Sequence, residues 1–540
     1  MQKKPEELLE GMNQSLDILY DAMNTEKNVS EKVNNAFLDQ CLNALTTYEK
    51  NEKGKRKIPN LKQEIESVTA ALENVRSLVN GDMDCALKKI RYELIPLTEN
   101  MRMDFHYYTW IYYDEEKRDA YPKGEMKKYF RNPYMEEAKR TGKYKYDVSI
   151  VIIGYNKLEY TKLCVESLLR YKPQNFSYEL ILLNHGSTDG TKEYFESIKP
   201  DKQLDVAVNG GGANALYTIM EGKYALTISN DIILTRNAVD NLYKCITSDE
   251  KIAWVVPTTP NVSNLQTIPA NYENMEEMFA FAEKNNISSE QRWEERVRLC
   301  NPIDIYRSDL LFQHVFGRKH LIPAVPFPDD KMSMFYRRAG YKLILAKDAY
   351  CYHFGSVTLG EENRNNQTRM YTKGRIDFIK DYGMDPWGYG FCYAPELFRK
   401  FQPDKLGEVN IMGVNSGLGS NILKIKELLK ENVDNRDVWM TGVSFSMMNK
   451  EDLESICEEA VITENWDYFK EESKRKYDYI LLENEVDKKC LESLEYILKW
   501  RKKDGVLILR VEDNAIVNAI LRKYRSEKIV DMQGYSWIKL

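Results

Sequence analysis

The stretch Val-Ser-Ile-Val-Ile-Ile-Gly-Tyr-Asn, residues 148–156, decides how the middle of the chain folds. Its apolar part has the length of one strand, and it ends in a glycine, a tyrosine and an asparagine before a helical pattern begins at residue 160. A short apolar run bounded by turn residues is consistent with a buried strand. The stretch therefore predicts a strand over Val148–Ile153, with Gly154, Tyr155 and Asn156 at its carboxyl end.

The residues that follow alternate between short apolar strands and helical segments, which predicts a mainly parallel sheet with helices on both faces. Ligands of such sheets bind at the carboxyl ends of the strands, so the residues after each strand are the candidates for a site. The expected strands are 148–153, 180–183, 206–208, 225–228 and 252–256, and the expected helices are 160–171, 191–198 and 213–220.

Two glycine-containing turns follow the second and third of these strands. Residues 184–191 read Asn-His-Gly-Ser-Thr-Asp-Gly-Thr and open a helix, so they present backbone N–H groups and a helix N-terminus to a ligand. Residues 209–214 read Asn-Gly-Gly-Gly-Ala-Asn, and glycines allow close approach of the backbone to a ligand. Each turn taken alone is equally compatible with an ordinary structural turn.

Carboxylates appear at two further points. The fourth strand ends in Ser229-Asn230-Asp231, and a carboxylate at a strand end can bind Mg²⁺, which can neutralise a diphosphate leaving group. Asp329 and Asp330 precede a helical pattern over residues 331–339. This pair can either cap the helix or supply a general base to an acceptor hydroxyl.

Together these motifs resemble the family 2 glycosyltransferases in order and spacing, and the resemblance includes Arg337-Arg338-Ala339-Gly340-Tyr341 and the later His353. It implies a GT-A fold over residues 145–385, a nucleoside diphosphate sugar donor, Mn²⁺ or Mg²⁺, and inversion at the anomeric carbon. Asp231 matches the family's metal ligand. His353 matches a histidine of the metal or diphosphate site, with a buried structural histidine as the alternative. Asp329 or Asp330 matches the general base, and the spacing to Gly340 favours Asp329.

The resemblance also implies a donor-binding set, and one departure from the family falls within it. The family has an aspartate that contacts the base where this chain has Asn184, followed here by His185, so the nucleotide stays open. An amide can still pair with a uracil edge, so a UDP donor stays compatible with Asn184. UDP-N-acetylglucosamine is one expected donor. The implied set is Gly154, Tyr155, Asn156, Asn184, Asp189, Gly211, Gly212, Asn214 and Asn230.

Residues 400–540 resemble class I methyltransferases. An expected strand over 409–413 leads into Gly-Val-Asn-Ser-Gly-Leu-Gly at 413–419, and further strands are expected at 438–442, 479–482 and 506–511. Methyltransferases place an acid after the second strand to hold the cofactor ribose, but residues 440–444 contain none. We therefore expect a degenerate Rossmann-like domain, with S-adenosylmethionine binding as the alternative.

Residues 1–140 repeat apolar side chains at helical spacing, which predicts a helical bundle or hairpin domain. We interpret it as a structural or oligomerising module, with docking of a partner or acceptor as the alternative. The overall expectation is thus an α/β protein in which a GT-A domain lies between a helical domain and a methyltransferase-type domain.

Bulk composition excludes several classes of protein. The chain has 540 residues, with 77 basic and 83 acidic side chains and a formal net charge of −6, which argues against a nucleic-acid partner. The nine cysteines are scattered, which favours reduced thiols and a cytoplasmic location. No apolar run approaches the roughly 20 residues that a transmembrane helix needs.

The expected activity is transfer of a sugar to an acceptor hydroxyl, such as a Ser or Thr of a bacterial protein like flagellin. One alternative is a glycosyltransferase that extends a glycan or cell-wall polymer and carries an active methyltransferase. A non-catalytic scaffold with the GT-A fold is the alternative of another class.

Overall fold

The computed structural model describes residues 5–25, 36–50, 58, 61–111, 114, 116–117, 132–206, 213–310, 327–355, 364–430, 437–484, 486–524, 526–530 and 535–540. The chain divides into two compact units, and each unit is built from segments that are separated in the sequence. The first unit comprises residues 1–240, 302–325 and 351–364. The second comprises residues 241–301, 326–350 and 365–540.

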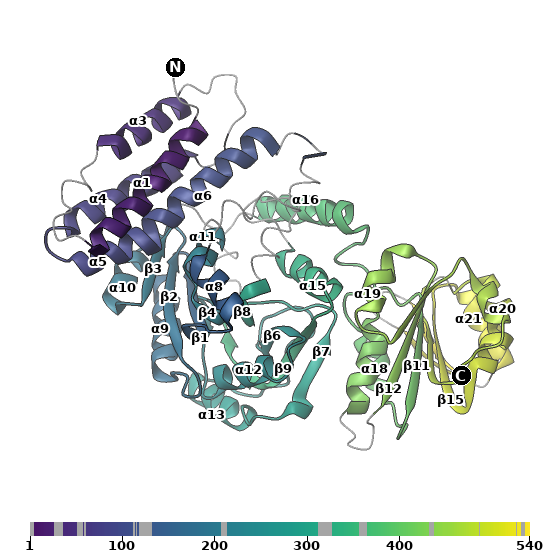
Figure 1. Cartoon of the computed structure of the whole chain (residues 1–540). Helices are drawn as coiled ribbons and strands as arrows, with labels where there is room; N and C mark the ends of the chain where they lie inside the picture. The colour runs from purple at the N-terminus through teal and green to yellow at the C-terminus, as the bar shows by residue number, and fades with distance from the viewer. Residues whose placement is uncertain are drawn as a thin grey trace. The chain divides into compact units, whose positions relative to one another are not determined.

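The first unit begins with helices that pack on one another, as the apolar spacing predicts (Figure 1, purple). Their inward faces are apolar; in α1, for example, Leu9, Met12 and Leu16 are almost fully buried. The π-helical turn η1 contacts strand β3, and α6 contacts α11, so this bundle packs directly on the α/β part of the unit. The helical elements are α1 Pro5–Thr25, α3 Ala36–Lys50, α4 Leu61–Leu78, α5 Met83–Lys89, η1 Ile90–Leu94, α6 Ile95–His106, η2 Tyr107–Ile111 and α8 Pro133–Thr141.

The sheet of the first unit has β1 at its centre and the strand order β3-β2-β1-β4-β8. The first four of these strands are parallel, and β8 runs antiparallel to β4. Parallel strands need crossover helices, and α9, α10 and α11 supply them. The elements are β1 Tyr146–Gly154, α9 Leu158–Arg170, β2 Tyr178–Asn184, α10 Thr191–Ile198, β3 Lys202–Asp205, α11 Ala213–Ile219, β4 Gly222–Ser229, β5 Ile232–Ile233, β8 Ile303–Arg307 and β10 Tyr352–His353.

The expected third strand at Val206–Val208 is wrong in its position. The strand is Lys202–Asp205, Val206 follows it, and residues 207–208 lie outside the described residues. Lys202 is buried and ion-paired, so the strand has a lysine at an inward position. Its sequence therefore lacks the apolar pattern by which a strand is predicted. The expected glycine-rich turn at residues 209–212 also lies outside the described residues.

The second unit contains a short mixed sheet with the order β6-β9-β7, in which β6 and β9 are parallel and β7 is antiparallel to β9. Helix α15 begins with the two expected carboxylates, and Pro328 stands at its first turn. Further elements along this part of the chain are α12 Ala238–Thr247, β6 Ile252–Thr258, α13 Met275–Asn285, η5 Glu290–Arg292, β7 Trp293–Arg296, α15 Pro328–Arg338, β9 Lys342–Tyr350, α16 Arg364–Tyr382 and α17 Pro395–Lys400.

Residues 409–539 of the second unit form a seven-stranded sheet that we call the C-terminal sheet, with the order β13-β12-β11-β14-β15-β17-β16. All neighbours are parallel except β17, which runs antiparallel to β15 and β16. Successive residues of β11 enter two different apolar cores, and helices cover both faces (Figure 1). The order therefore defines a doubly wound sheet whose connections change direction between β11 and β14.

The elements of the C-terminal sheet include the four expected strands to within a few residues, except that β15 begins at Arg501 instead of residue 506. They are β11 Val409–Val414, α18 Ser420–Lys430, β12 Val438–Ser444, η7 Met447–Asn449, α19 Lys450–Glu454, β13 Glu459–Ile462, η8 Trp466–Lys470, β14 Tyr477–Leu482, α20 Lys488–Trp500, β15 Arg501–Val511, α21 Asn514–Lys523, β16 Glu527–Val530 and β17 Ser536–Lys539. In the described part of the chain, no helix has the length and apolar character that crossing a bilayer requires.

Candidate functional site

Asp231 and His353 meet at the carboxyl end of strand β4 in the first unit. The residues beside them form a two-stranded antiparallel ribbon, β5 with β10, in which His353 pairs with Ile232. His353 Nε2 lies 3.2 Å from Asp231 Oδ2, and each residue is 8% exposed. The backbone N–H of Phe354 also donates to the Asp231 carbonyl at 3.1 Å. The ribbon thus brings together two expected metal ligands that are far apart in the sequence.

Asn230 joins the ends of β4 and β1. Its side-chain amide donates to the carbonyl of Asn156 at 2.9 Å and to Oγ1 of Thr161 at 2.8 Å, and its backbone N–H donates to the carbonyl of Ile153. Asn156 has a φ of 51°, a left-handed conformation that asparagine tolerates better than most residues. The expected donor residue Asn230 therefore fixes the turn that presents Asn156 at this edge.

Asp189 fixes the start of helix α10 against the start of α9. One carboxylate oxygen accepts from the backbone N–H of Leu158 at 2.8 Å, and the other accepts from the Thr191 hydroxyl at 2.7 Å. Although partial burial opposes it, these hydrogen bonds lower the pKa of Asp189. Asp189 is therefore ionised and holds the turn over 184–191 in shape.

Asn184 is almost completely buried, and both ends of its amide have partners within the chain. Nδ2 donates to Oδ1 of Asp205 at 3.0 Å, and Oδ1 accepts from the backbone N–H of Ser187 at 3.0 Å. Asp205 ends strand β3, next to the position where the family's aspartate is expected. Because the third strand was expected at residues 206–208, Asp205 was not identified as an acid at the end of a parallel strand. That position is the signal that would have marked it as a candidate site residue.

The glycines that were expected to bind the donor differ in what the structure shows of them. A Cβ at Gly154 would lie 2.9 Å from the ring of Phe195 on α10, so close packing of that helix on β1 requires the glycine. Tyr155 follows as a half-buried residue. Gly211 and Gly212 lie outside the described residues, and Asn214 lies in helix α11 with a side chain that is not described.

Asp329 and Asp330 lie in the first turn of α15 in the second unit, and their surroundings differ. Asp330 is 2% exposed, and its Oδ1 lies 2.8 Å from Nε of Arg298. Burial raises the pKa of Asp330 to about 6, although Arg298 opposes the shift. Asp329 is half-buried, and its Oδ2 lies 3.4 Å from the backbone N–H of Asn301. Accessibility therefore favours Asp329 as the residue that reaches a substrate.

The other end of α15 carries a residue that sequence reasoning did not assign to a site. Arg337 is 1% exposed, and its guanidinium donates to the carbonyls of Leu418 at 3.2 Å and Asp452 at 2.9 Å. It also donates to the hydroxyl of Ser455 at 3.1 Å. The helix that begins with the two carboxylates is thus anchored to the first turn of the C-terminal sheet.

The carboxylate of Asp231 and the imidazole of His353 suit a divalent cation. Carboxylate oxygen is a ligand for Mg²⁺ and Mn²⁺, and these ions commonly take further ligands from substrate phosphates and water. Among the described residues, no group of three or more His, Cys, Asp or Glu side chains could hold a metal. Two protein ligands leave room for a diphosphate, so the chemistry of the pair fits an ion that binds together with a substrate.

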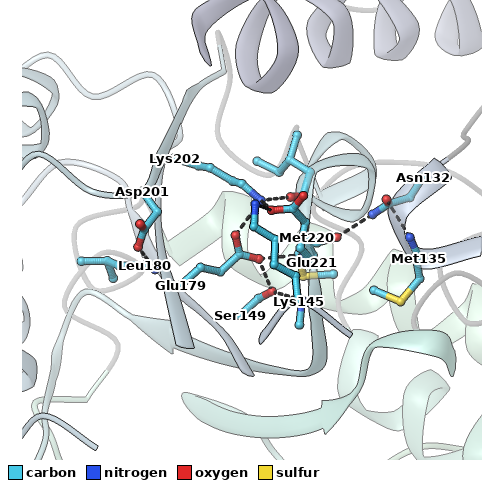
Figure 2. Close-up of polar contacts among 12 residues, drawn as sticks. Asn132, Met135, Lys145, Ser149, Glu179, Leu180, Asp201, Lys202, Met220 and Glu221 are labelled. Atoms are coloured by element: carbon cyan, nitrogen blue, oxygen red, sulfur yellow. Dashed lines mark hydrogen bonds and ion pairs between the residues drawn. The ribbon is translucent and has the colours of Figure 1, made fainter. Parts of the chain in front are cut away.

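A second charged cluster lies at the opposite, amino end of the same strands (Figure 2). Lys202 Nζ lies 2.5 Å from a carboxylate oxygen of Glu179 and 2.9 Å from one of Glu221, and all three side chains are buried. The Ser149 hydroxyl donates to Glu179 at 2.5 Å, and Lys145 adds a second cation at 2.9 Å from Glu221. Burial opposes the shift, but Lys202 and Lys145 hold the pKa of Glu221 below its ordinary value.

The glycine-rich turn after β11 is filled by the chain itself. Gly390 lies so close to this turn that a Cβ would be 3.1 Å from the backbone nitrogen of Leu418. The Tyr389 hydroxyl donates to Glu483, which follows β14 and is 1% exposed, and it accepts from Asn421 at 2.7 Å. A buried acid, Glu483, therefore follows β14, and its partners include Tyr389, which precedes the C-terminal sheet, and Asn421.

The sequence matches the family model described as Glycosyl transferase family 2 over residues 149–294. This stretch contains β1 to β4 and the strand end with Asp231. The match identifies residues 149–294 as a glycosyl transferase domain and the chain as a glycosyltransferase enzyme.

Two solved structures resemble the chain at low sequence identity. One is "GalNAc-T7 with UDP, GalNAc and Mn2+", at 12% identity and a TM-score of 0.30, covering 38% of this chain and 44% of that one. The other is the mannosyltransferase PcManGT from Pyrobaculum calidifontis in complex with GDP-Man and Mn2+, at 17% identity and a TM-score of 0.31, covering 50% and 77%. The chain thus spans less than half the length of the first structure. No curated protein matches the sequence.

Proposed function

We propose that the chain is an inverting, metal-dependent GT-A glycosyltransferase that moves a sugar from a nucleoside diphosphate to an acceptor hydroxyl. The observation that carries the proposal is the pair of Asp231 and His353, which converge to 3.2 Å at the carboxyl end of β4. Parallel α/β sheets bind ligands at this edge. Asp231 also lies within the stretch that matches the glycosyl transferase family.

Asp231 and His353 would hold Mn²⁺ or Mg²⁺. Such an ion supplies charge neutralisation to the departing diphosphate. The turns over 154–156 and 184–191 would line the nucleoside. Asn184 stands where the family contacts the base, and it donates a hydrogen bond to Asp205. UDP-N-acetylglucosamine is the proposed donor.

Asp329 is the proposed general base, and Asp330 is its alternative. The acceptor oxygen forms a bond to the anomeric carbon while the bond from that carbon to the diphosphate oxygen breaks. The acceptor proton passes to the carboxylate, and one inversion results. Asp329 is half-buried and Asp330 is paired with Arg298, so Asp329 is the more accessible of the two carboxylates.

The proposed acceptor is a Ser or Thr hydroxyl of a bacterial protein such as flagellin, in a cytoplasmic setting. The N-terminal helices would serve oligomerisation or docking of the acceptor. A second candidate is extension of a glycan, and one observation favours it: an aromatic-lined cavity that Arg298, the partner of Asp330, also lines.

The C-terminal sheet is proposed to be a degenerate methyltransferase-type domain that does not use S-adenosylmethionine. Its doubly wound strand order and the glycine-rich turn at 413–419 support the methyltransferase type. The insertion of Tyr389 and Gly390 at that turn supports the loss of cofactor binding.

Donor hydrolysis tests the proposed function. The full chain is incubated with Mn²⁺ and with UDP-sugars or GDP-sugars, and release of the nucleoside diphosphate is measured. We expect metal-dependent release from at least one donor, abolished by Asp231→Ala. No release from any donor, or release that Asp231→Ala leaves unchanged, would overturn the proposal.

A further inference from the structure

The linker between α16 and the C-terminal sheet forms a cavity with residues that precede α15. The cavity has a volume of about 360 Å³ and lies entirely within the second unit. This volume is at the lower end of the range of about 300–1,000 Å³ for small-molecule sites. Its walls come from residues 386–396 of the linker, from Asn264, Leu265 and Arg298, and from Arg510 on β15.

The linker is held rigidly on the C-terminal sheet. Tyr389 bonds to Glu483 and Asn421, and the Ser420 hydroxyl donates to the carbonyl of Cys392 at 2.9 Å. The backbone N–H of Ala394 donates to Oδ1 of Asn421 at 2.8 Å. The start of α18, which follows the glycine-rich turn, therefore anchors one wall of the cavity.

Aromatic rings dominate the linker side of the cavity. Trp387 is 53% exposed, and the guanidinium of Arg375 lies 5.1 Å from its ring centroid. Tyr393 has Arg296 and Lys424 each 4.8 Å from its ring centroid, and the Tyr389 ring is covered by Arg510 at 4.0 Å. Arg296 and Lys424 line a neighbouring cavity, whereas this one combines the exposed Trp387 with the polar side chains of Asn264, Arg298, Glu396 and Arg510.

The two arginines that line the cavity each have an acidic residue nearby, and Glu396 adds a carboxylate to its wall. Arg298 pairs with Asp330 at 2.8 Å, and Arg510 stacks between Tyr389 and Tyr535 near the buried Glu483. A phosphate or carboxylate ligand would need an excess of cations, which this balance does not provide. A neutral ligand with many hydroxyl groups and an apolar ring face satisfies both the aromatic wall and the polar rim.

The cavity is also connected to the proposed catalytic carboxylates. Arg298 lines the cavity and contacts Asp330, and Asp329 precedes Asp330 in the same helical turn. Arg337 fixes the other end of that helix to Leu418 in the glycine-rich turn. The C-terminal sheet therefore positions both the carboxylates and the aromatic wall of the cavity.

We propose that this cavity binds a sugar ring of the acceptor, so that the enzyme extends a glycan, and that Trp387 stacks on that ring as a specificity-determining residue. The proposal rests on the proposed glycosyltransferase function and takes its second candidate, extension of a glycan, in place of transfer to a protein side chain. The C-terminal sheet then acts as a support for acceptor binding.

Saturation-transfer difference NMR tests the proposal on the full-length protein with Mn²⁺ and UDP. The probes are methyl glycosides of common hexoses and N-acetylhexosamines, and a separate set of Ser- and Thr-containing peptides. Trp387→Ala is compared with Trp439→Ala, a matched control, because Trp439 is also partly exposed and lies 4.1 Å below the guanidinium of Arg475 in a different cavity. Trp387→Tyr keeps an aromatic face, and thermal melting checks that each variant is folded.

We expect at least one methyl glycoside to bind, to lose binding at least about tenfold in Trp387→Ala, and to bind normally in Trp439→Ala. Trp387→Tyr should retain part of the affinity. The proposal is overturned if no glycoside binds, if binding survives Trp387→Ala in a folded protein, or if a peptide binds and is lost in that variant. Donor hydrolysis without acceptor is measured in parallel. If hydrolysis persists while glycosides fail to bind, only the acceptor proposal fails, whereas absent hydrolysis in the wild type overturns the proposed function itself.

Discussion

The same set of parallel strands carries a charged cluster at each end, and the two clusters differ in how completely their charges are matched. At the amino end, Lys202 and Lys145 face Glu179 and Glu221, so two cations balance two carboxylates in a largely buried network. At the carboxyl end, Asp231 faces His353, whose imidazole is a ligand for a metal when it is neutral.

This difference separates a structural cluster from a candidate site. A buried ion network whose members satisfy one another has no capacity for a ligand, and removing one member leaves an uncompensated charge. A carboxylate and an imidazole at a strand end can instead share a cation with a substrate. The comparison predicts that changes at the carboxyl end alter turnover, whereas changes at the amino end alter stability.

The largest expected effect is that of Asp231→Asn on turnover. The amide keeps the size of the side chain but weakens a metal ligand that is worth several kcal/mol in charge stabilisation, so donor turnover should fall by about 10²–10⁴-fold. The rate is measured with Mn²⁺ and the best nucleotide sugar, and the melting temperature is measured on the same sample. A variant with wild-type turnover would contradict the assignment of the metal site.

Asp329→Asn should have the next largest effect. Loss of a general base lowers a transfer rate by about 10²–10⁴-fold, while the affinity for the donor should stay unchanged. Asp330→Asn is the control, because it alters the neighbouring carboxylate of the same helical turn. If Asp330→Asn abolishes transfer and Asp329→Asn does not, the base is Asp330.

Lys202→Met tests the amino end of the comparison. Removing one partner of a buried pair costs about 3–5 kcal/mol of unfolding free energy, which denaturant titration measures. Lys145→Met is matched to it, because Lys145 contacts the same Glu221 but its side chain is 55% exposed. Its removal leaves Glu221 paired with Lys202, so the loss of stability should be smaller. A large loss of turnover per folded molecule in Lys202→Met would show that the amino-end cluster is not purely structural.

The two ends of the sheet also differ in how well the sequence predicted them. Most strands and the polar residues after them were predicted, because apolar runs and turn residues are local signals. Asp231 and His353 were paired only through the family resemblance, since a two-residue strand such as β10 leaves no pattern. Lys202 has the composition of a surface residue, and only its tertiary partners Glu179 and Glu221 explain its burial.

The residues missed in the second unit have the same physical explanation. The roles of Arg298 and Arg337 depend on partners that lie far away in the sequence, namely Asp330 and the carbonyls of Leu418 and Asp452. Nothing local distinguishes such arginines from exposed ones. The linker likewise has a turn-like composition, and its insertion at the glycine-rich turn is a consequence of tertiary packing.

Asp330 should make a smaller, pH-dependent contribution to stability. Burial raises its pKa in the folded state to about 6, above the ordinary value, so the protonated form is favoured by folding. This contribution is fully present below the ordinary pKa of an aspartate, about 3.9, and is lost as the pH rises through about 6. One pKa unit corresponds to about 1.4 kcal/mol, so the contribution is about 3 kcal/mol at most. Between these values the melting temperature of the wild type should therefore fall by a few °C relative to Asp330→Asn. Parallel pH profiles of the two proteins would refute the shift.

The smallest expected effect concerns the binding of S-adenosylmethionine. We predict no measurable binding of this molecule to the full-length protein. The glycine-rich turn at 413–419 is in contact with Gly390, and the buried Glu483 is engaged by Tyr389 and Asn421, so a nucleoside would have to displace the linker. Calorimetry with S-adenosylmethionine, and a thermal shift at saturating concentration, measure this directly. Binding in the wild type would show that the linker moves aside, and the C-terminal sheet would then have to be assigned a catalytic role of its own.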